Sequence, residues 1–311
     1  MTRKLERLFN FQLIKLKPFH FQEILSELQK FNPNTQKPSS KKTLTDLKNV
    51  AKQIFNLAIQ NRVVDYNPLS SVKVDTQVSP NKRRPLTPLE QNWVISTPHR
   101  AQTAAMIMMF AGLRRGELLA LTWNDIDLEN KTIAINKSIV FVDGKSLIKS
   151  GGKTVSSSRI IYCPKILIDY LKKESINKKY DELLCSKKDG KLMTDSSWKQ
   201  LWNSYMHDLN FLYGDFSFLK KIPKSKHNPK GIPFVIDRFT AHYLRHTFAT
   251  SLYLSGIDVL SAKEQLGHLD IKTTLDIYVH LDKIHKRKSM EKYDNFINAT
   301  QMQVNKTHES T

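Results

Sequence analysis

The sequence is poor in cysteine and has no long apolar segment. Cys163 and Cys185 are the only cysteines in 311 residues, too few for a disulfide framework. No run reaches the roughly 18 apolar residues that a membrane span needs, and the longest candidate, residues 103–113, has only the length of a core helix. The basic N-terminus lacks the apolar region and cleavage site of a secretory signal. These absences predict a protein of the reducing cytoplasm without a membrane segment.

Acidic residues and metal-site patterns are also scarce. Lysine and arginine number 49 against 29 aspartates and glutamates, which gives a formal net charge of +20 and a pI of about 9.8. No group of Asp, His or Cys has the spacing of a metal site. A balance this basic favours polyanionic partners, either nucleic acid or an acidic membrane surface.

The positive charge is concentrated near the N-terminus. Residues 1–86 hold 16 lysines and arginines against 6 acidic residues, a net charge of +10, and the other 225 residues carry the remaining +10. The basic residues are spread through helical sequence and are not gathered beside an apolar segment. This distribution favours a surface that follows a phosphate backbone. The alternative is a solvated lysine-rich face that reflects composition alone.

Residues 1–75 predict a small, basic, all-helical domain. Pro18, at a first-turn position, precedes an apolar stripe of Ile24, Leu25 and Leu28 at helical spacing. A bundle this small is marginally stable alone and usually needs another helix. We therefore interpret it as part of a longer module.

A longer helix is predicted over residues 41–61, with Ser39 or Ser40 as its N-cap. Its apolar positions recur at helical spacing: Leu44, Leu47, Val50, Ala51, Ile54, Phe55 and Ala58. A basic linker that contains proline follows at residues 76–86.

A second domain begins at Thr87. The tetrapeptide TPLE, residues 87–90, offers a capping box with proline at the first helical position. An apolar helix follows and ends at Gly112. Arg114 and Glu117 then lie at the start of a new helix, where a glycine turn can hold an arginine rigidly toward a phosphate. Taken alone, a surface Arg–Glu pair in a first helical turn is the better interpretation.

Residues 131–164 change to a period of two, which is typical of strands. The predicted strands lie at residues 131–136, 138–142 and 157–164. Asp143-Gly144 is a turn signal. A polar loop over residues 148–159 carries Lys153, and a lysine at such a hairpin tip is normally solvated.

Two further helices are predicted at residues 165–174 and 196–211, and a long loop at residues 213–238. Beyond them, His242 and Arg245 are three residues apart, so they share one face of a helix and can reach one anion together. Gly256 ends that helix, and a second helical run ends just before His268, ten residues before Tyr278. Cationic and hydrogen-bonding groups beside a hydroxyl indicate chemistry on a phosphate. A single H-x-x-R match, however, occurs often by chance.

Four blocks of sequence occur in this order: AGLRRGELLAL, KTVSSSRIIYCP, AHYLRHTFAT and LGHLDIKTTLDIYVH. Together they resemble the tyrosine recombinase or phage integrase family. The resemblance covers the chain from about Thr87. It extends more weakly to LKNVAKQIFNLAIQN and YNP, which look like the end of the family's core-binding domain. The motif NPKG before the third block is similar to members from Gram-positive phages and conjugative elements.

The resemblance implies a mainly α protein. A small helical core-binding domain, residues 1–75, would precede an α+β catalytic domain with a small antiparallel sheet at residues 87–282. A C-terminal helix and tail would occupy residues 283–311.

The resemblance also implies roles for the residues that match the family's motifs. Arg114 and Arg245 correspond to the arginines that hold the non-bridging oxygens of the scissile phosphate. Lys153 corresponds to the hairpin lysine that protonates the leaving 5′ oxygen, and Tyr278 to the nucleophile. The implied product is a 3′-phosphotyrosyl link that another DNA end can reverse, so we expect neither a metal nor a cofactor.

Three other motif positions are matched. His242 is the histidine that can accept the proton of the tyrosine, and His268 matches the second His or Trp position. Glu117 matches the acidic position that steadies the site without reacting. Arg115 and His246 only neighbour motif positions, and we assign them structural roles.

Double-stranded DNA is the implied partner, in a bacterial cytoplasm near the nucleoid, with a homotetramer on the DNA. In the family a C-terminal helix packs onto a neighbouring subunit, and residues 283–311 contain a sparse apolar face of Ile284, Tyr293, Phe296 and Ile297. A helix folded back onto its own domain is the alternative. The family's additional arm-binding module is not matched in this sequence, so the chain resembles either simpler members or a shortened form of a longer protein.

Three other functions fit parts of the pattern. A type IB topoisomerase uses the same groups to nick and religate one duplex, but the basic helical N-terminal domain and the hairpin lysine favour a recombinase. A catalytically inactive DNA-binding regulator would not need all six reacting groups. A helical scaffold protein would not bind DNA with the steep salt dependence of counterion release. The sequence therefore predicts a site-specific recombinase of the integrase or excisionase type, encoded by a mobile genetic element.

Overall fold

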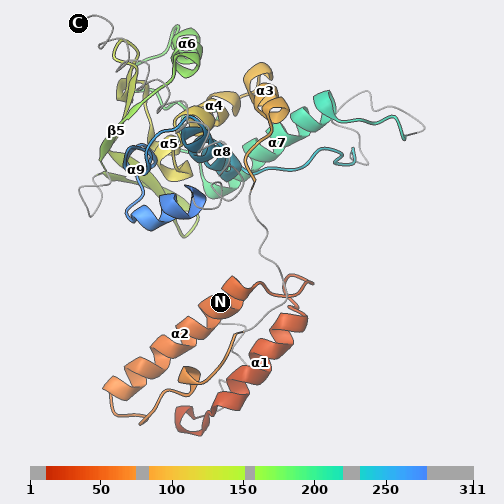
Figure 1. Ribbon diagram of the computed structural model, residues 1–311, viewed down its shortest axis with the longest axis vertical. Coiled ribbons are helices and arrows are strands. Elements are labelled where there is room, and N and C mark those ends of the chain that lie inside the picture. The colour runs from red at the N-terminus through yellow and green to blue at the C-terminus, as the bar shows by residue number, and fades with distance from the viewer. Residues whose placement is uncertain (1–11, 75–83, 151–157, 220–231, 279–311) are drawn as a thin grey trace, which may run out of the picture. The chain divides into compact units, whose positions relative to one another are not determined.

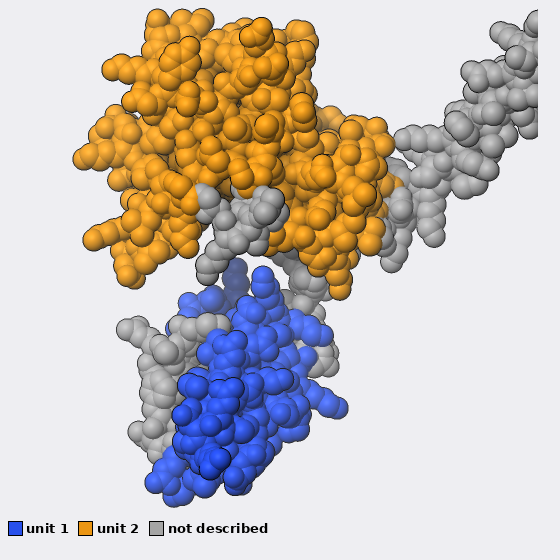
Figure 2. Space-filling view, turned by 90° about the vertical axis from the view of Figure 1, so that its left-hand side faces the viewer, with its two compact units in different colours: residues 1–82 blue, residues 83–311 orange. Residues whose placement is uncertain are grey.

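The computed structural model describes residues 12–74, 84–150, 158–219 and 232–278. The chain divides into two compact units, residues 1–82 and 83–311 (Figure 2). The division lies within the stretch that the sequence predicts as a linker. Among the helices of the described residues, none has the length and apolar character needed to cross a membrane.

In its described residues, 12–74, the first unit contains two helices and two short 3₁₀ turns. Its elements are η2 (Leu13–Lys15), α1 (Pro18–Lys30), α2 (Lys41–Gln60) and η3 (Pro68–Ser70). The α1 helix begins at Pro18 and buries Phe21 together with the predicted stripe. That α1 and α2 belong to a DNA-binding domain stays a prediction.

The N-cap of α2 is Ser40, whose hydroxyl accepts a hydrogen bond from the amide of Thr43 at 3.2 Å. The predicted cap is therefore confirmed. Most of the predicted apolar positions are buried, but Ile54 is 47% exposed because it lies beyond the edge of the buried stripe.

The second unit combines helices with a small sheet and a hairpin (Figure 1). Its helices are α3 (Pro88–Ser96), α4 (Gln102–Phe110), α5 (Arg115–Ala120), η4 (Trp123–Asp125), α6 (Lys165–Glu174), α7 (Asp195–Tyr213), α8 (Ala241–Leu254) and α9 (Val259–Leu266). Its strands are β1 (Ile126–Asp127), β2 (Thr132–Ile135), β3 (Lys137–Val142), β4 (Lys145–Ser150) and β5 (Arg159–Tyr162). Residues 271–278 are also helical. The predicted mainly α fold with a small antiparallel sheet is confirmed.

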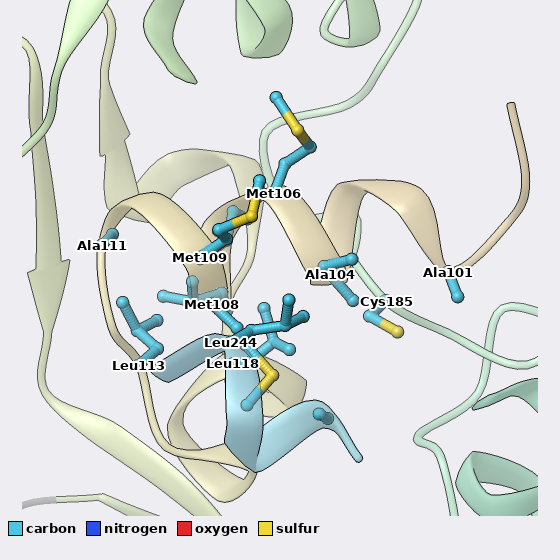
Figure 3. Close-up of a cluster of buried hydrophobic side chains, with 14 of the residues drawn as sticks. Ala101, Ala104, Met106, Met108, Met109, Ala111, Leu113, Leu118, Cys185 and Leu244 are labelled. Carbon is cyan, nitrogen blue, oxygen red and sulfur yellow. The ribbon is translucent and has the colours of Figure 1, made fainter. Parts of the chain in front are cut away.

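The α4 helix forms the middle of the core of this unit. It contacts α3, α5, α6 and α8, and its residues from 104 to 109 are all buried. A helix that is apolar on all sides is typical of a buried position. Figure 3 shows Met108 and Met109 of α4 gathered with Leu118 of α5 and Leu244 of α8. The core thereby fixes α5 and α8, where the predicted arginines lie.

The capping box predicted at the start of this unit is confirmed. Thr87 accepts a hydrogen bond from the amide of Glu90, and the carboxylate of Glu90 accepts one from the amide of Thr87. The helices predicted at residues 165–174 and 196–211 are confirmed as α6 and α7, although α7 begins one residue earlier and ends at Tyr213. In the described part of the predicted long loop, residues 214–219 and 232–238 form neither helix nor strand.

The sheet has the antiparallel strand order β1-β2-β5. Ile133 of β2 faces Ile161 of β5, and both are fully buried. Ile135 and Arg159 form the other pair on the same face, because alternate residues of a strand point to one side. The sheet therefore directs an arginine toward the interior of the unit.

The hairpin of β3 and β4 turns at Asp143 and Gly144, whose φ angles of 48° and 75° fit a type I′ turn. The turn prediction is confirmed. The prediction of a polar loop over residues 148–159 is wrong for residues 148–150, which belong to β4. This strand is largely exposed, so its sequence has no apolar alternation that would reveal it. Lys153 lies outside the described residues.

Gly112 makes the turn between α4 and α5 close against α8. Its φ is +66°, and a Cβ atom on it would lie only 2.2 Å from Cδ1 of the Phe248 ring. Glycine is therefore required for both conformation and space. The close approach also lets the carbonyl oxygen of Gly112 accept a hydrogen bond from Arg245.

We predict that Gly112→Ala lowers the free energy of unfolding more than Gly144→Ala does. Gly144 also has a positive φ, of +75°, but nothing lies within 4 Å of its Cβ position. Gly144→Ala should therefore cost only the left-handed conformation, about 1–2 kcal/mol, whereas Gly112→Ala adds overpacking worth about 1–3 kcal/mol. Urea unfolding of both variants measures the difference, and equal losses would contradict the contact with Phe248.

Candidate active site

The carbonyl end of α9 is the centre of the site. The helix ends at Leu266, and Gly267, with a φ of 63°, forms its left-handed cap. The amides of Gly267 and of the next residue donate to the carbonyl oxygens of Glu264 and Lys263 at 3.0 and 3.1 Å. The carbonyls of Gln265, Leu266 and Gly267 face arginine side chains instead. A helix C-terminus carries partial negative charge, so it attracts these cations.

Arg245 is a buried cation held by backbone carbonyls. Only 5% of this residue is exposed, and its guanidinium donates to the carbonyl of Leu266 at 2.7 Å and to that of Gly112. Burial, and then the charge of Arg114, lowers the pKa of Arg245 to about 9, so it remains charged at pH 7. A guanidinium has five N–H donors, and two carbonyls do not exhaust them.

Arg114 links the start of α5 to the end of α9. Its backbone amide donates to one carboxylate oxygen of Glu117 at 2.9 Å, and its Nη1 donates to the other at 2.8 Å. Its Nη2 donates to the carbonyl of Gly267 at 2.5 Å. The side chain of Arg114 is 44% exposed, so it can also meet a ligand from solvent.

Glu117, the acidic residue that the resemblance assigns to the site, is a buried carboxylate. Burial alone would raise its pKa, but hydrogen bonds and charge from Arg159, together with Arg114, lower the pKa to about 2. The carboxylate is therefore ionised at any pH at which the protein would act.

Arg159 was not predicted as a site residue. Its side chain is 9% exposed and donates to both carboxylate oxygens of Glu117, at 3.0 and 2.9 Å. Its Nε lies 3.5 Å from the carbonyl oxygen of Gln265. The strand period was the available signal, because Arg159 shares the buried face of β5 with Ile161.

His268 lies beside the arginines and is held by a second helix. Its Nδ1 lies 2.8 Å from the hydroxyl of Thr274, which is fully buried in the helical residues 271–278. Burial, and then the charges of Arg245 and Arg114, lower the pKa of His268 to about 4. The imidazole is therefore neutral at pH 7, and Thr274 joins it to the helix that carries Tyr278.

In this structure the hydroxyl of Tyr278 is hydrogen-bonded to a backbone carbonyl. It donates to the carbonyl oxygen of Ile257, in the turn between α8 and α9, at 3.0 Å. Its ring packs edge-on against Tyr253, and only 6% of Tyr278 is exposed. Burial, and then the charge of Asp258, raise the pKa of Tyr278 to about 12. In this position the phenol is a poor nucleophile.

His242 lies in the first turn of α8 and is exposed. It borders an open cavity of about 490 Å³ that is also lined by Arg115, Lys199 and Arg238. Arg115 pairs with Asp195 at 2.8 Å.

Four of the seven predicted residues gather at one place: Arg114, Glu117, Arg245 and His268. In the part of the chain that the structure describes, no three His, Cys, Asp or Glu side chains lie so that they could hold a metal ion. Two guanidiniums and a neutral imidazole around a helix end can bind an anion such as a phosphate group.

Known protein sequences that are similar to this chain point to one family. The model of the phage integrase family matches residues 89–285. A tyrosine recombinase XerC-like protein of Caldanaerobacter subterraneus subsp. tengcongensis is 28% identical over 279 residues, 84% of this chain and 68% of that protein. The ICEBs1 integrase of Bacillus subtilis is 29% identical over 265 residues, 83% of this chain and 67% of that protein. The chain thus spans about two thirds of the length of these relatives.

Solved structures share the fold. The Tn1549 transposon integrase in complex with a circular intermediate DNA has a TM-score of 0.71 at 23% identity, over 94% of this chain and 92% of that chain. A lambda integrase dimer bound to a core site has a TM-score of 0.57 at 16% identity, over 89% of this chain and 68% of that chain.

We predict that the ring of His268 titrates near pH 4, well below the ordinary value of about 6.5 for histidine. Since the unfolded chain binds this proton at a higher pH than the folded one, His268 reduces stability as the pH falls from 6.5 toward 4. Histidine-ring NMR measures the titration, with His268→Gln to assign the signal. In urea unfolding the same variant should lose less stability between pH 7 and pH 5 than the unchanged protein. A ring that titrates at 6.5 would contradict the burial of His268 among arginines.

Proposed function

The chain belongs to the phage integrase family and is a tyrosine-type site-specific DNA recombinase; we propose here which of its residues carry the reaction and how. The observation that carries the proposal is the pair of guanidiniums, Arg114 and Arg245, held at the carbonyl end of α9 beside Glu117 and His268. The scissile phosphate of a DNA strand would bind between the two arginines.

The arginines would stabilise the transition state. Attack on a phosphodiester builds negative charge on its non-bridging oxygens, and fixed guanidiniums offset this charge without having to reorganise. The planar fork of arginine matches two phosphate oxygens at once. Arg245 is anchored by two carbonyls and Arg114 by Glu117 and Gly267, so both would be oriented before the substrate arrives.

Tyr278 would be the nucleophile, after its hydroxyl leaves the carbonyl of Ile257. Near the two arginines the positive field would lower the phenol pKa, which burial now raises. The tyrosine oxygen would bond to phosphorus as the bond to the 5′ oxygen breaks. His242 would accept the phenol proton and Lys153 would give one to the leaving 5′ oxygen.

The product would be a 3′-phosphotyrosyl link, which the 5′ hydroxyl of a second DNA end could attack in the reverse sense. His268 suits a supporting role in both directions. With Nδ1 of the neutral ring accepting a hydrogen bond from the hydroxyl of Thr274, Nε2 would carry the proton and donate it in a hydrogen bond to a phosphate oxygen. No step in this scheme requires a cofactor.

Double-stranded DNA is the substrate that we propose. The net charge of +20 supports this, and two of the similar solved structures are DNA complexes of a transposon integrase and of lambda integrase. Relatives from a conjugative element, a phage and a transposon support strand exchange for a mobile element in the bacterial cytoplasm. The topoisomerase, regulator and scaffold alternatives have no support in these relatives.

Assembly of a homotetramer on DNA is a further part of the proposal. Exposed leucines lie at the last described elements of the chain: Leu254, Leu260, Leu269 and Leu275. Apolar side chains at the surface favour burial against a partner. We propose that they receive the C-terminal residues 283–311 of a neighbouring subunit.

Tyr278→Phe should abolish the covalent protein–DNA adduct that forms on a nicked suicide duplex, because phenylalanine has no attacking oxygen. Tyr253→Phe is the matched control: its ring contacts that of Tyr278, and the adduct should still form. Denaturing gel electrophoresis detects the adduct. An adduct with Tyr278→Phe, or none with the unchanged protein on its own target DNA, would refute the assignment.

Deleting residues 283–311 should weaken the assembly of complexes with several subunits on DNA, while the affinity for a single site stays nearly unchanged. Leu260→Lys should do the same. Leu89→Lys, in α3 and equally exposed, should leave assembly intact. Gel-shift titrations on one-site and two-site DNA measure both quantities, and an equal loss of both would show that the segment folds back onto its own subunit.

A further inference from the structure

Positive charge is in excess at the end of α9, and Arg159 contributes to this excess. Arg114, Arg159 and Arg245 surround one carboxylate, that of Glu117, and His268 is neutral. If Glu117 were paired with Arg114 alone, that pair would be neutral and the site would lose half of its positive charge. With Arg159 as a second partner of Glu117, the cluster keeps a surplus of two positive charges for an anionic ligand.

The contact between Arg159 and Glu117 is also the more buried of the two, since the Arg114 side chain is 44% exposed. Arg159 meets both carboxylate oxygens, at 3.0 and 2.9 Å, and both side chains are 9% exposed. A two-bond contact between planar groups fixes the orientation of both. Arg114 reaches the same carboxylate through its amide and through Nη1. Arg159 therefore helps to fix the carboxylate that accepts the hydrogen bond of the Arg114 side chain.

A second route leads from Arg159 to Arg114 through Gly267. A Cβ atom on Gly267 would lie 2.5 Å from Cζ of Arg159, so the guanidinium occupies the space next to this glycine. The carbonyl oxygen of Gly267 accepts the bond from Nη2 of Arg114. Arg159 thus supports both acceptors that hold Arg114, the carboxylate of Glu117 and the turn at Gly267.

We propose that Arg159 is a positioning residue for DNA cleavage, which acts through Glu117 and Gly267 to orient Arg114 toward the scissile phosphate. This inference rests on the proposed function. Arg159 does not touch the phosphate itself, because its guanidinium is buried against the carboxylate. Substitution of Arg159 should therefore lower the rate of DNA cleavage and leave the affinity for DNA nearly unaltered.

The test compares Arg159→Lys with the unchanged protein. Lysine keeps the charge but cannot form the two-bond contact. Arg84→Lys is the matched control. Arg84 forms the same kind of two-bond contact with Glu90, at 2.6 Å for both bonds, but this contact lies at the start of α3, not at the end of α9. Single-turnover cleavage of a suicide duplex, DNA affinity and thermal unfolding are measured for all three proteins.

Each protein also cleaves a duplex with a methylphosphonate at the scissile position. Replacing one non-bridging oxygen by a methyl group removes the charge that an oriented Arg114 would offset. We expect Arg159→Lys to slow cleavage of the ordinary phosphodiester about 10- to 100-fold, as misplacement of a positioning group does, with DNA affinity within about twofold. On the methylphosphonate this defect should shrink to about threefold or less. Arg84→Lys should cleave both substrates at rates close to those of the unchanged protein.

Three outcomes would overturn the inference. Cleavage at the unchanged rate by Arg159→Lys would exclude a positioning role, and the same defect on both substrates would mean that Arg159 only supports the fold. No cleavage by the unchanged protein would refute the proposed function as well. A further check uses Glu117→Gln: if Arg159 acts through Glu117, then adding Arg159→Lys to that variant should cost much less than it does alone.

Discussion

The site depends on three arginine guanidiniums, each of which faces one of three successive backbone carbonyls at the end of α9. A helix leaves its last carbonyls without partners inside the helix. Here the carbonyls of residues 265, 266 and 267 face Arg159, Arg245 and Arg114. The arginines come from β5, from α8 and from the start of α5. One helix end therefore gathers three segments that are far apart in the chain, and the buried core around α4 holds two of them in place.

Burying this much positive charge requires compensation, and Glu117 supplies it. An ionised side chain inside a protein is costly unless it is paired or hydrogen-bonded. A single carboxylate shared by Arg114 and Arg159 stabilises the cluster without neutralising it. The backbone carbonyls that hold Arg245 are dipoles and not charges. The site consequently remains positive, which is what binding of a phosphodiester demands.

Tyr278, the proposed nucleophile, makes its contacts outside this cation cluster. Tyr278 donates to Ile257 and is covered by Tyr253, whereas His268, ten residues earlier in the sequence, belongs to the cluster. The contact between His268 and Thr274 ties the helix of Tyr278 to the arginines at its other end. A movement of this helix would therefore shift the Tyr278 hydroxyl while the contacts of the arginines with α9 remain in place.

Local sequence determined the helices and their caps, and it supplied the residues proposed for the site. Capping boxes, glycine ends and apolar periods act over a few residues, so they predicted α3, α8 and α9, and the ordered motifs identified the family. Tertiary structure alone decided the partners across the fold. Arg159 lies 42 residues from Glu117, and the exposed strand β4 is defined by its pairing with β3. The hydroxyl of Tyr278 reaches a backbone carbonyl 21 residues away. Backbone carbonyls are identical along any sequence, so only packing selects which one an arginine or a tyrosine meets.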